Sequence, residues 1–233
     1  MRQIVLDTET TGLDYRMGDR IIEIGCVELL NRKLTGQRFH RFINPEREVE
    51  AGALAVHGLS NEFLQDKPRF GEIVSAFLDF IRGAELIIHN AAFDTGFLDN
   101  EMALQRQAPL ERVCTGIVDT LKMARELHPG RRNSLDALCE RYAIDNSGRT
   151  LHGALLDAEL LAEVYLAMTR GQETLLMELD RPPADGFHAV LPAERPPLRV
   201  VRANAGELAE HGRVLEEIGR ESRGNCLWQR PLA

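Results

Sequence analysis

The sequence predicts an α/β fold in which a mixed sheet is flanked by helices. Three observations support this prediction: strand-like segments near the N-terminus, a change to helical spacing near residue 68, and alternating strand-like and helix-like segments after it. With 233 residues, of which 44% are hydrophobic, the chain can bury one substantial core and carry an appended element.

Three segments near the N-terminus have the pattern of strands, and they cover residues 3–7, 20–30 and 37–43. The first two are largely apolar, and the third, QRFHRFI, alternates between polar and apolar residues, as a strand with one buried face does. Short polar turns between these segments favour a meander.

Helical spacing begins in residues 67–83, where Pro68 suits a first helical turn and Gly83 suits a stop. The apolar residues of this segment recur on one face, at Phe70, Ile73, Val74, Phe77 and Ile81. After it we expect a buried strand at 84–90, a helix at 92–105, a short strand at 116–119, helices at 121–127 and 134–142, and a long helix at 153–168.

A concentration of proline marks the end of this pattern. Five of the ten prolines fall in residues 182–197, where no packed helix or central strand can run. Beyond them, residues 205–222 can form a short amphipathic helix with apolar positions Leu208, Leu215 and Ile218. We therefore expect three regions: a folded domain in residues 1–171, a linker in 172–204 and a short C-terminal docking segment in 205–233.

The composition argues against several classes of protein. The sequence has no run of about 18 apolar residues and starts without the apolar region of a signal peptide, so we expect a soluble, cytoplasmic protein. The four cysteines lack the spacing of a zinc site or a disulfide scaffold, and we expect them to be reduced. The net charge of −8 disfavours a broad basic surface for nucleic acid. If the protein acts on nucleic acid, another feature must bring it there.

Two carboxylates one residue apart end the first apolar segment, in IVLDTETTGLD. Because side chains alternate along a strand, Asp7 and Glu9 point to the same side, and two like charges this close cost free energy unless a cation offsets them. An isolated pair of this kind is more often two solvated acids in a loop. Two further acids favour a site instead, because Asp94 follows another buried strand and Asp157 lies on the inward stripe of the last helix, with Ala154, Leu161 and Val164.

The four acids together predict a metal site. Asp7, Glu9, Asp94 and Asp157 offer hard oxygen ligands, which suit Mg²⁺ or Mn²⁺ better than zinc. Two such ions about 3.5–4 Å apart can stabilise the attacking and leaving oxygens in the cleavage of a phosphodiester.

His152 lies five residues before Asp157, a rotation of about 140° on an ideal helix, so we expect it in the loop or first turn before that helix. Its ordinary pKa near 6.5 would let a neutral imidazole act there as a general base toward water. For an isolated histidine, the alternative is a surface or capping role.

Three motifs carry a resemblance to a known family. In this order, DTETTG, HNAAFD and a His followed five residues later by Asp resemble the three exonuclease motifs of the DEDD superfamily, in its histidine-bearing branch. Within that branch, the chain is most similar to proofreading exonucleases of bacterial replicative polymerases, and the motifs span residues 1 to about 170. The resemblance implies a ribonuclease H-like fold and 3′ to 5′ removal of mispaired nucleotides from a DNA 3′ end, with two divalent metal ions.

The resemblance also implies roles for particular residues. Four positions would hold the metals, Asp7, Glu9, Asp94 and Asp157, and His152 would activate water. The positions that line the terminal nucleotide in the family correspond here to Thr10, Leu13, Val56, His57, Asn90 and Phe93. For His57 and Phe93, ordinary core packing is the alternative.

Two short segments after the motifs resemble docking peptides. Gln172, Leu175 and Leu176 resemble the peptide by which bacterial replication proteins bind the sliding clamp, although a fraying helix end is the alternative. Leu227 and Trp228, the only Trp, resemble a tail that docks on the catalytic subunit of DNA polymerase III. Such tethering would supply DNA 3′ ends to an acidic protein that does not bind DNA strongly itself.

Two other functions remain open at this point. One is an RNA-trimming or oligoribonuclease-like enzyme of the same superfamily, although such enzymes usually lack a linker and a docking tail. The other is a catalytically idle adaptor that only bridges clamp and polymerase, which the presence of all five catalytic positions disfavours.

Overall fold

The computed structural model describes residues 1–148, 151–170, 202–222 and 228. The chain divides into two units, Met1–Asp180 and Arg181–Ala233. Within the described residues, the first unit holds all the strands, and the second holds the single helix α9 (Ala205–Glu221).

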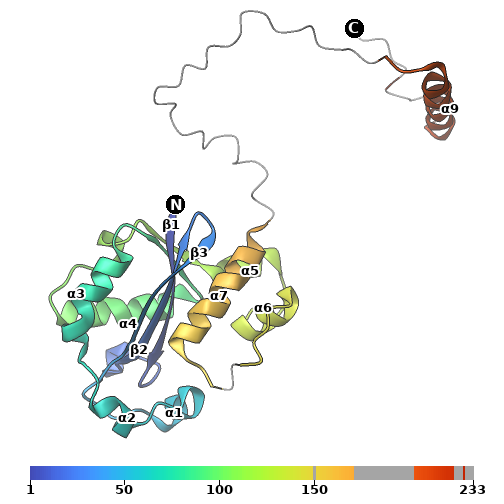
Figure 1. The fold of residues 1–233 in the computed structure, drawn as a ribbon. Helices are drawn as coiled ribbons and strands as arrows, with labels where there is room; N and C mark the ends of the chain where they lie inside the picture. Colours follow the sequence, from blue (N-terminus) through green and yellow to red (C-terminus); the bar gives the residue numbers. More distant parts are fainter. Residues whose placement is uncertain (149–150, 171–201, 223–227, 229–233) are drawn as a thin grey trace, which may run out of the picture. The chain divides into compact units, whose positions relative to one another are not determined.

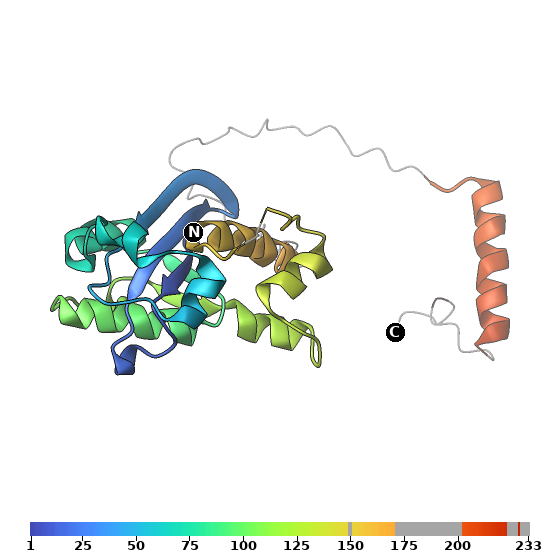
Figure 2. The same ribbon diagram turned by 90° about the horizontal axis from the view of Figure 1, so that it is seen from below.

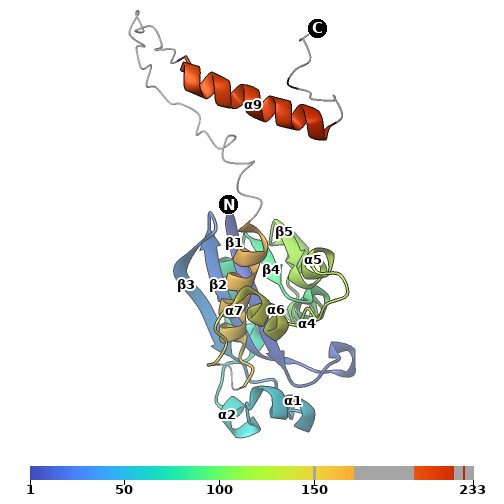
Figure 3. The same ribbon diagram turned by 90° about the vertical axis from the view of Figure 1, so that its right-hand side faces the viewer.

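A mixed sheet of five strands forms the centre of the first unit (Figure 1). The strands are β1 (Arg2–Thr10), β2 (Ile21–Leu30), β3 (Lys33–Phe42), β4 (Glu85–Ile88) and β5 (Gly116–Asp119). They lie in the order β3-β2-β1-β4-β5, which Figure 3 shows from one side of the sheet to the other. The pairs β1–β2 and β2–β3 are antiparallel, whereas β1–β4 and β4–β5 are parallel. The predicted meander and mixed sheet are therefore confirmed.

Helices cover both faces of this sheet (Figure 1). The helices of one face are α3 (Phe70–Ile81) and α4 (Ala91–Leu104), and those of the other are α5 (Thr120–Leu127), α6 (Leu135–Tyr142) and α7 (Ala154–Met168). The neighbours Ile4 and Val5 belong to opposite core clusters, because successive side chains of a strand point to opposite faces. A strand buried on both faces has a continuous apolar run, which explains the start of the sequence.

The apolar face predicted for helix α3 is confirmed, since all its members are buried: Phe70, Ile73, Val74, Phe77 and Ile81. The helix begins later than predicted, however. Arg69 is its N-cap, so Pro68 precedes the helix instead of lying in its first turn. The carbonyl of Pro68 accepts a hydrogen bond of 2.9 Å from the amide of Asn44, which ties this residue to the end of the meander.

Several local features differ from the prediction. Residues 11–20, expected as a short polar turn, form an ordered loop with a 3₁₀ turn at Tyr15–Met17. Strand β3 begins at Lys33 instead of residue 37, because its first six residues are exposed and have no alternation to reveal the strand. Two short helices were not predicted, α1 (Ala51–His57) and α2 (Asn61–Gln65), since neither is long enough to show a helical period.

Helices α1 and α2 lie at the end of the sheet where β1 ends (Figures 1 and 3). Figure 2, which looks onto that end, shows the cyan helix α1 in front of the strands. The amide of Glu50 donates to the carbonyl of Thr11 at 2.9 Å, so the start of α1 is tied to the loop that follows β1.

The predicted C-terminal helix is present as α9. Asn204 and Glu207 form a capping box at its start, and its apolar residues Leu208 and Ile218 are exposed. None of the helices in the described part of the chain is long and apolar enough to cross a membrane.

Candidate active site

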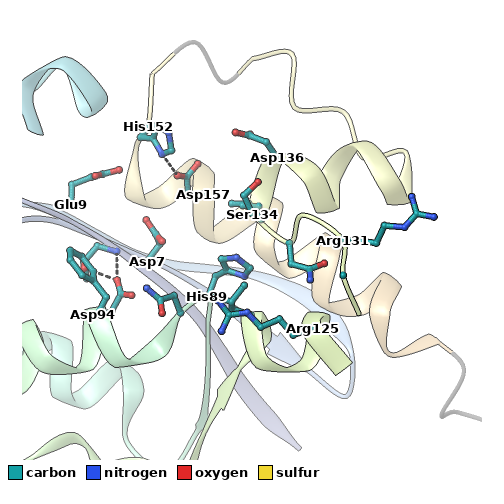
Figure 4. Close-up of a pocket in the computed structure, with 17 residues that line it drawn as sticks. Asp7, Glu9, His89, Asp94, Arg125, Arg131, Ser134, Asp136, His152 and Asp157 are labelled. Carbon is teal, nitrogen blue, oxygen red and sulfur yellow. Dashed lines mark hydrogen bonds and ion pairs between the residues drawn. The ribbon is translucent and has the colours of Figure 1, made fainter. Parts of the chain in front are cut away.

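Asp7 and Glu9 lie near the end of strand β1, and both line one cavity (Figure 4). They are partly exposed, whereas Thr8 between them is buried. The alternation along β1 therefore places the two carboxylates on the same side, as the sequence predicts.

Asp94 reaches the same place from a neighbouring strand. Strand β4 is parallel to β1, so both strands end at the same edge of the sheet. Asn90, with a left-handed φ of 62°, then turns the chain into α4, whose first turn carries Asp94. Oδ1 of Asp94 accepts hydrogen bonds from the amide and hydroxyl of Thr8, at 3.1 and 2.7 Å. Burial raises the pKa of Asp94 to about 7, so its charged form depends on such donors or on a cation.

Asp157 is brought to the cavity by the start of helix α7. Gly25 of β2, which pairs with Asp7, makes this approach possible. A Cβ atom at Gly25 would lie 2.2 Å from the carbonyl carbon of Ala154 and the amide nitrogen of Leu155, so only glycine leaves room for the helix backbone. Asp157 lies in the first turn of α7, where the positive end of the helix dipole favours a carboxylate.

His152 precedes the N-cap Gly153, which confirms its predicted position before the helix. Its Nδ1 lies 3.2 Å from Oδ2 of Asp157, while 44% of its side chain remains exposed. The imidazole is therefore oriented by the carboxylate and accessible from the cavity.

The cavity that these residues line has a volume of about 770 Å³. All five predicted catalytic positions take part in its lining: Asp7, Glu9, Asp94, His152 and Asp157. Ligand atoms of Glu9, His152 and Asp157 lie within 4.8 Å of one another, so this group could hold a metal ion. Asp7 and Asp94 line the same cavity outside that close group.

The residues expected to line a terminal nucleotide fall into two sets. Asn90 and Phe93 line the cavity, whereas Thr10, Leu13, Val56 and His57 do not. Leu13 is 83% exposed on the loop after β1, and the hydroxyl of Thr10 donates to the carbonyl of Gly12 at 2.6 Å.

Helix α1 brings Val56 and His57 beside the loop that carries His152. The carbonyl of Val56 accepts a hydrogen bond of 3.2 Å from the amide of His152, and the Val56 side chain is exposed. His57 is buried, and its Nδ1 accepts a hydrogen bond from the amide of Leu59 at 3.0 Å. Nε2 of His57 is buried without a hydrogen-bond partner among the described residues.

Much of the cavity wall is formed by residues that the sequence motifs do not indicate. His89 follows β4 directly, and the rule that parallel strands end at one edge could have identified it. The other missed side chains come from β1, from α5, from the segment between α5 and α6, and from the start of α6: Thr8, Leu121, Arg125, Arg131, Asn133, Ser134, Leu135 and Asp136. Most of these belong to segments with no motif, and only the tertiary fold brings them to the cavity.

The predicted docking positions are mostly outside the described residues. Gln172, Leu175, Leu176 and Leu227 all fall there, as does the proline-rich segment 182–197. Trp228 is described, and it is 82% exposed.

Comparison with protein families and sequences gives a consistent result. The model of the Exonuclease family, of the RNase T type, matches residues 4–165. The chain is 51% identical to the DNA polymerase III subunit epsilon of Salmonella typhimurium, over 98% of this chain and 97% of that protein. The subunit of the same name from Escherichia coli is 51% identical, over 98% of this chain and 97% of that protein. The one from Pasteurella multocida is 50% identical, over 100% of this chain and 95% of that protein.

Solved structures with a similar fold are also exonucleases. Exonuclease X in complex with 5′ overhanging duplex DNA has a TM-score of 0.56 at 24% identity, covering 72% of this chain and 92% of its own. Exonuclease I of E. coli, in complex with a dT13 oligonucleotide, has a TM-score of 0.64 at 16% identity, covering 73% of this chain and 41% of its own. At these identities the likeness concerns the fold, and it agrees with the predicted ribonuclease H-like sheet.

Proposed function

The chain belongs to the RNase T-type Exonuclease family, and from this we propose that it is the proofreading 3′ to 5′ exonuclease subunit of a bacterial DNA polymerase III. It removes mispaired nucleotides from a DNA 3′ end by hydrolysing the terminal phosphodiester. The observation that carries this conclusion is the extent of the similarity, 51% identity over nearly the full length of epsilon subunits. The gathering of carboxylates from β1, α4 and α7 in one cavity fits the same chemistry.

The donor set of the cavity fits divalent cations. We propose that Asp7, Glu9, Asp94 and Asp157 hold two ions, Mg²⁺ or Mn²⁺, since carboxylate oxygens are the ligands that these ions prefer. When bound, such ions supply charge stabilisation for the attacking and leaving oxygens of the phosphodiester. The close group of Glu9, His152 and Asp157 supports a cation at this end of the cavity.

His152 has the position of a general base. A neutral imidazole whose Nδ1–H donates to Asp157 can take the proton of the attacking water at Nε2. Asp157, 3.2 Å from Nδ1, orients the ring. The hydrogen bond from the His152 amide to the carbonyl of Val56 holds the loop that carries it.

We propose that the terminal nucleotide lies between the acids and helix α1. Asn90 and Phe93 support this proposal from within the cavity, and exposed Leu13 and Val56 offer apolar surface for a base. Nε2 of His57 is buried, has no hydrogen-bond partner among the described residues and does not line the cavity, so a nucleotide would reach it only after a local rearrangement. Thr10 would then support the loop that presents Leu13.

The enzyme would reach its substrate through partners. We propose that residues 205–233, including Leu227 and Trp228, dock on the catalytic subunit of DNA polymerase III, and that Gln172, Leu175 and Leu176 bind the sliding clamp. The exposed apolar residues of α9 and the 82% exposed Trp228 support a docking role for the C-terminal segment. Tethering raises the local concentration of DNA 3′ ends, which suits a chain with a net charge of −8.

Digestion of a 3′-mismatched duplex, with and without the polymerase, tests the activity. We expect release of nucleoside monophosphates that depends on Mg²⁺ or Mn²⁺ and stops when the metal is chelated. Short single-stranded RNA is the comparison substrate. Faster hydrolysis of RNA than of the mismatched DNA would favour the RNA-trimming alternative, and no hydrolysis of either would favour an idle adaptor.

Deletion of residues 205–233 tests the docking proposal separately. The shortened chain should hydrolyse short oligonucleotides at the rate of the full chain, because the cavity belongs to the first unit. It should no longer co-purify with the polymerase. Retained co-purification would refute a docking role for this segment, whatever the nuclease activity.

A further inference from the structure

The cavity extends well beyond the five catalytic positions. Its other part is lined by α5 and by the segment leading into α6, with Arg125, Arg131 and Ser134 among the lining side chains. Figure 4 shows Arg125 and Arg131 on the far side of Asp7 and His89 from Glu9. One end of the cavity is thus acidic, and the other carries two guanidinium groups.

The two arginines differ from the arginines that support the fold. Arg20, Arg38 and Arg47 each form an ion pair with a carboxylate at 2.6 to 3.1 Å. By contrast, neither Arg125 nor Arg131 has an ion pair or a side-chain hydrogen bond with any residue in the described ranges. Both are exposed, and neither belongs to a core cluster. Folding therefore does not account for their place in the wall of the cavity.

One acid lies in the same part of the cavity. Asp136, in the first turn of α6, also lines the cavity, and its Oδ1 accepts a hydrogen bond from Nδ2 of Asn146 at 3.3 Å. Among the side chains that line this end, two guanidinium groups therefore stand against one carboxylate, and Asp119, which acts electrostatically on His89, does not line the cavity. Such an end attracts an anion, and guanidinium groups suit phosphate because they offer paired N–H donors.

The arrangement of the cavity indicates which phosphates of a DNA substrate would bind at this end. If the cleaved phosphate lies at the acids and the terminal nucleotide lies toward α1, the strand must leave the acids on the opposite side. Arg125 and Arg131 lie on that side (Figure 4). We propose that these two arginines bind phosphates of the DNA strand upstream of the cleaved bond, and thereby position the strand. This inference rests on the exonuclease function proposed above and adds a subsite to it.

Kinetics on substrates of two lengths test the proposal. The variants are Arg125→Gln, Arg131→Gln and the double variant, and Arg112→Gln is the control because Arg112 is exposed and does not line the cavity. One substrate is a single-stranded oligodeoxynucleotide of about 12 nucleotides, within the range that single-strand sites span. The other is the p-nitrophenyl ester of thymidine 5′-monophosphate, which has no upstream phosphate.

We expect each substitution to raise KM for the oligonucleotide about fivefold, the size of an exposed ionic contact, with kcat little changed. The slope of log KM against log salt concentration should fall by about 0.7 for each arginine removed. Hydrolysis of the ester should change less than twofold, and Arg112→Gln should match the wild type on both substrates. Arg125→Lys should retain most of the affinity, because it keeps the charge.

Other outcomes would overturn the proposal. An unchanged KM for the oligonucleotide in the double variant would exclude contact with the strand. An equal loss of kcat/KM on the oligonucleotide and on the ester would mean that the arginines act through the five catalytic positions. Failure of the wild-type enzyme to hydrolyse either substrate with metal present would instead refute the proposed function, so the two failures are distinguishable.

Discussion

At the scale of single residues, neighbouring groups hold the acids of the site in position. Asp94 is fixed by two hydrogen bonds from Thr8, and Asp157 contacts His152 at 3.2 Å. Thr8 is next to Asp7 in strand β1. Its hydrogen bonds to Asp94 therefore link the positions of Asp7 and Asp94. Such contacts limit the movement of side chains that must meet at one substrate atom.

Substitution of His152 tests its role as a base. His152→Ala should lower kcat by about 10²- to 10⁴-fold, the usual contribution of a general base, while the fold stays intact. Release of mononucleotides from DNA measures the effect, and Asp157→Ala should likewise remove most activity. His211→Ala, on exposed helix α9, is the matched control. Wild-type activity in purified His152→Ala, with metal present, would exclude the assignment.

A buried ion pair near the site supports the loop that follows β1. Nε and Nη2 of Arg20 donate to Glu101 at 2.6 and 2.8 Å, and Glu101 is 1% exposed. Oε1 of Glu101 also accepts from the amide of Ile21 at 3.3 Å, so the carboxylate joins helix α4 to the start of β2. Removal of Arg20 leaves the Glu101 carboxylate buried without compensation, whereas Arg20 itself is 21% exposed.

We therefore expect Arg20→Ala to lower the free energy of unfolding by about 3–5 kcal/mol, as measured by urea denaturation. Asp79→Ala is the control, because Asp79 pairs with Arg82 at 3.4 Å on the surface. Asp79→Ala should lower the free energy of unfolding by less than about 1 kcal/mol. Equal effects of the two substitutions would contradict this view of the buried pair.

At the scale of elements, the site depends on how closely α7 approaches the sheet. Gly25 lies opposite Asp7 in the β1–β2 pair, and the backbone at Ala154 and Leu155 occupies the space where a side chain would be. One strand position therefore controls the distance between Asp7 on β1 and Asp157 on α7.

Gly25→Ala should consequently displace the start of α7. We expect overpacking to lower the free energy of unfolding by about 1–3 kcal/mol, which leaves the protein folded. We expect kcat of the nuclease to fall by about 100-fold, because a small displacement of Asp157 disturbs the geometry of the site. Gly116→Ala, in strand β5, is the control, since its Cβ would lie no closer than 3.9 Å to another atom. If Gly25→Ala keeps wild-type kcat, the close approach is not needed for the site.

At the scale of the whole molecule, the buried His57 and the partly buried His89 link stability to pH. Burial lowers the pKa of both His57 and His89. The folded state then binds fewer protons than the unfolded state below the ordinary pKa of about 6.5. The stability that these groups contribute is present above that pH and is lost as the pH falls toward the lowered pKa values.

Urea midpoints measured between about pH 7.5 and pH 5 test this linkage. Because burial raises the pKa of Asp94 to about 7, this group gains stability as the pH falls and opposes the histidines. The readout is therefore the difference between two proteins: lowering the pH should destabilise His89→Gln less than the wild type, because the lowered pKa of His89 no longer contributes. His211→Gln, with an exposed histidine, should follow the wild type. An identical pH dependence in His89→Gln and the wild type would show that the burial of His89 does not contribute.

Much of the fold could be predicted from the sequence because it depends on local patterns. The apolar run of β1, the one-sided face of α3 and the inward stripe of α7 are each visible in a short window, and the structure contains all three. The first half of strand β3 and the short helices α1 and α2 have no such periodicity. Their conformations depend on tertiary contacts such as the hydrogen bond from Glu50 to Thr11.

The five catalytic positions could be proposed in advance because each lies in a motif that ends a strand or begins a helix. What the sequence by itself determined was therefore the kind of chemistry: acids and one histidine in a fixed order along the chain. The tertiary structure alone decided which side chains complete the cavity. Arg125, Arg131 and Ser134 reach it through chain segments with no motif. The physical reason is that periodicity and motifs are properties of neighbours in the chain, whereas the wall of a cavity is formed by residues distant in the sequence that packing brings together.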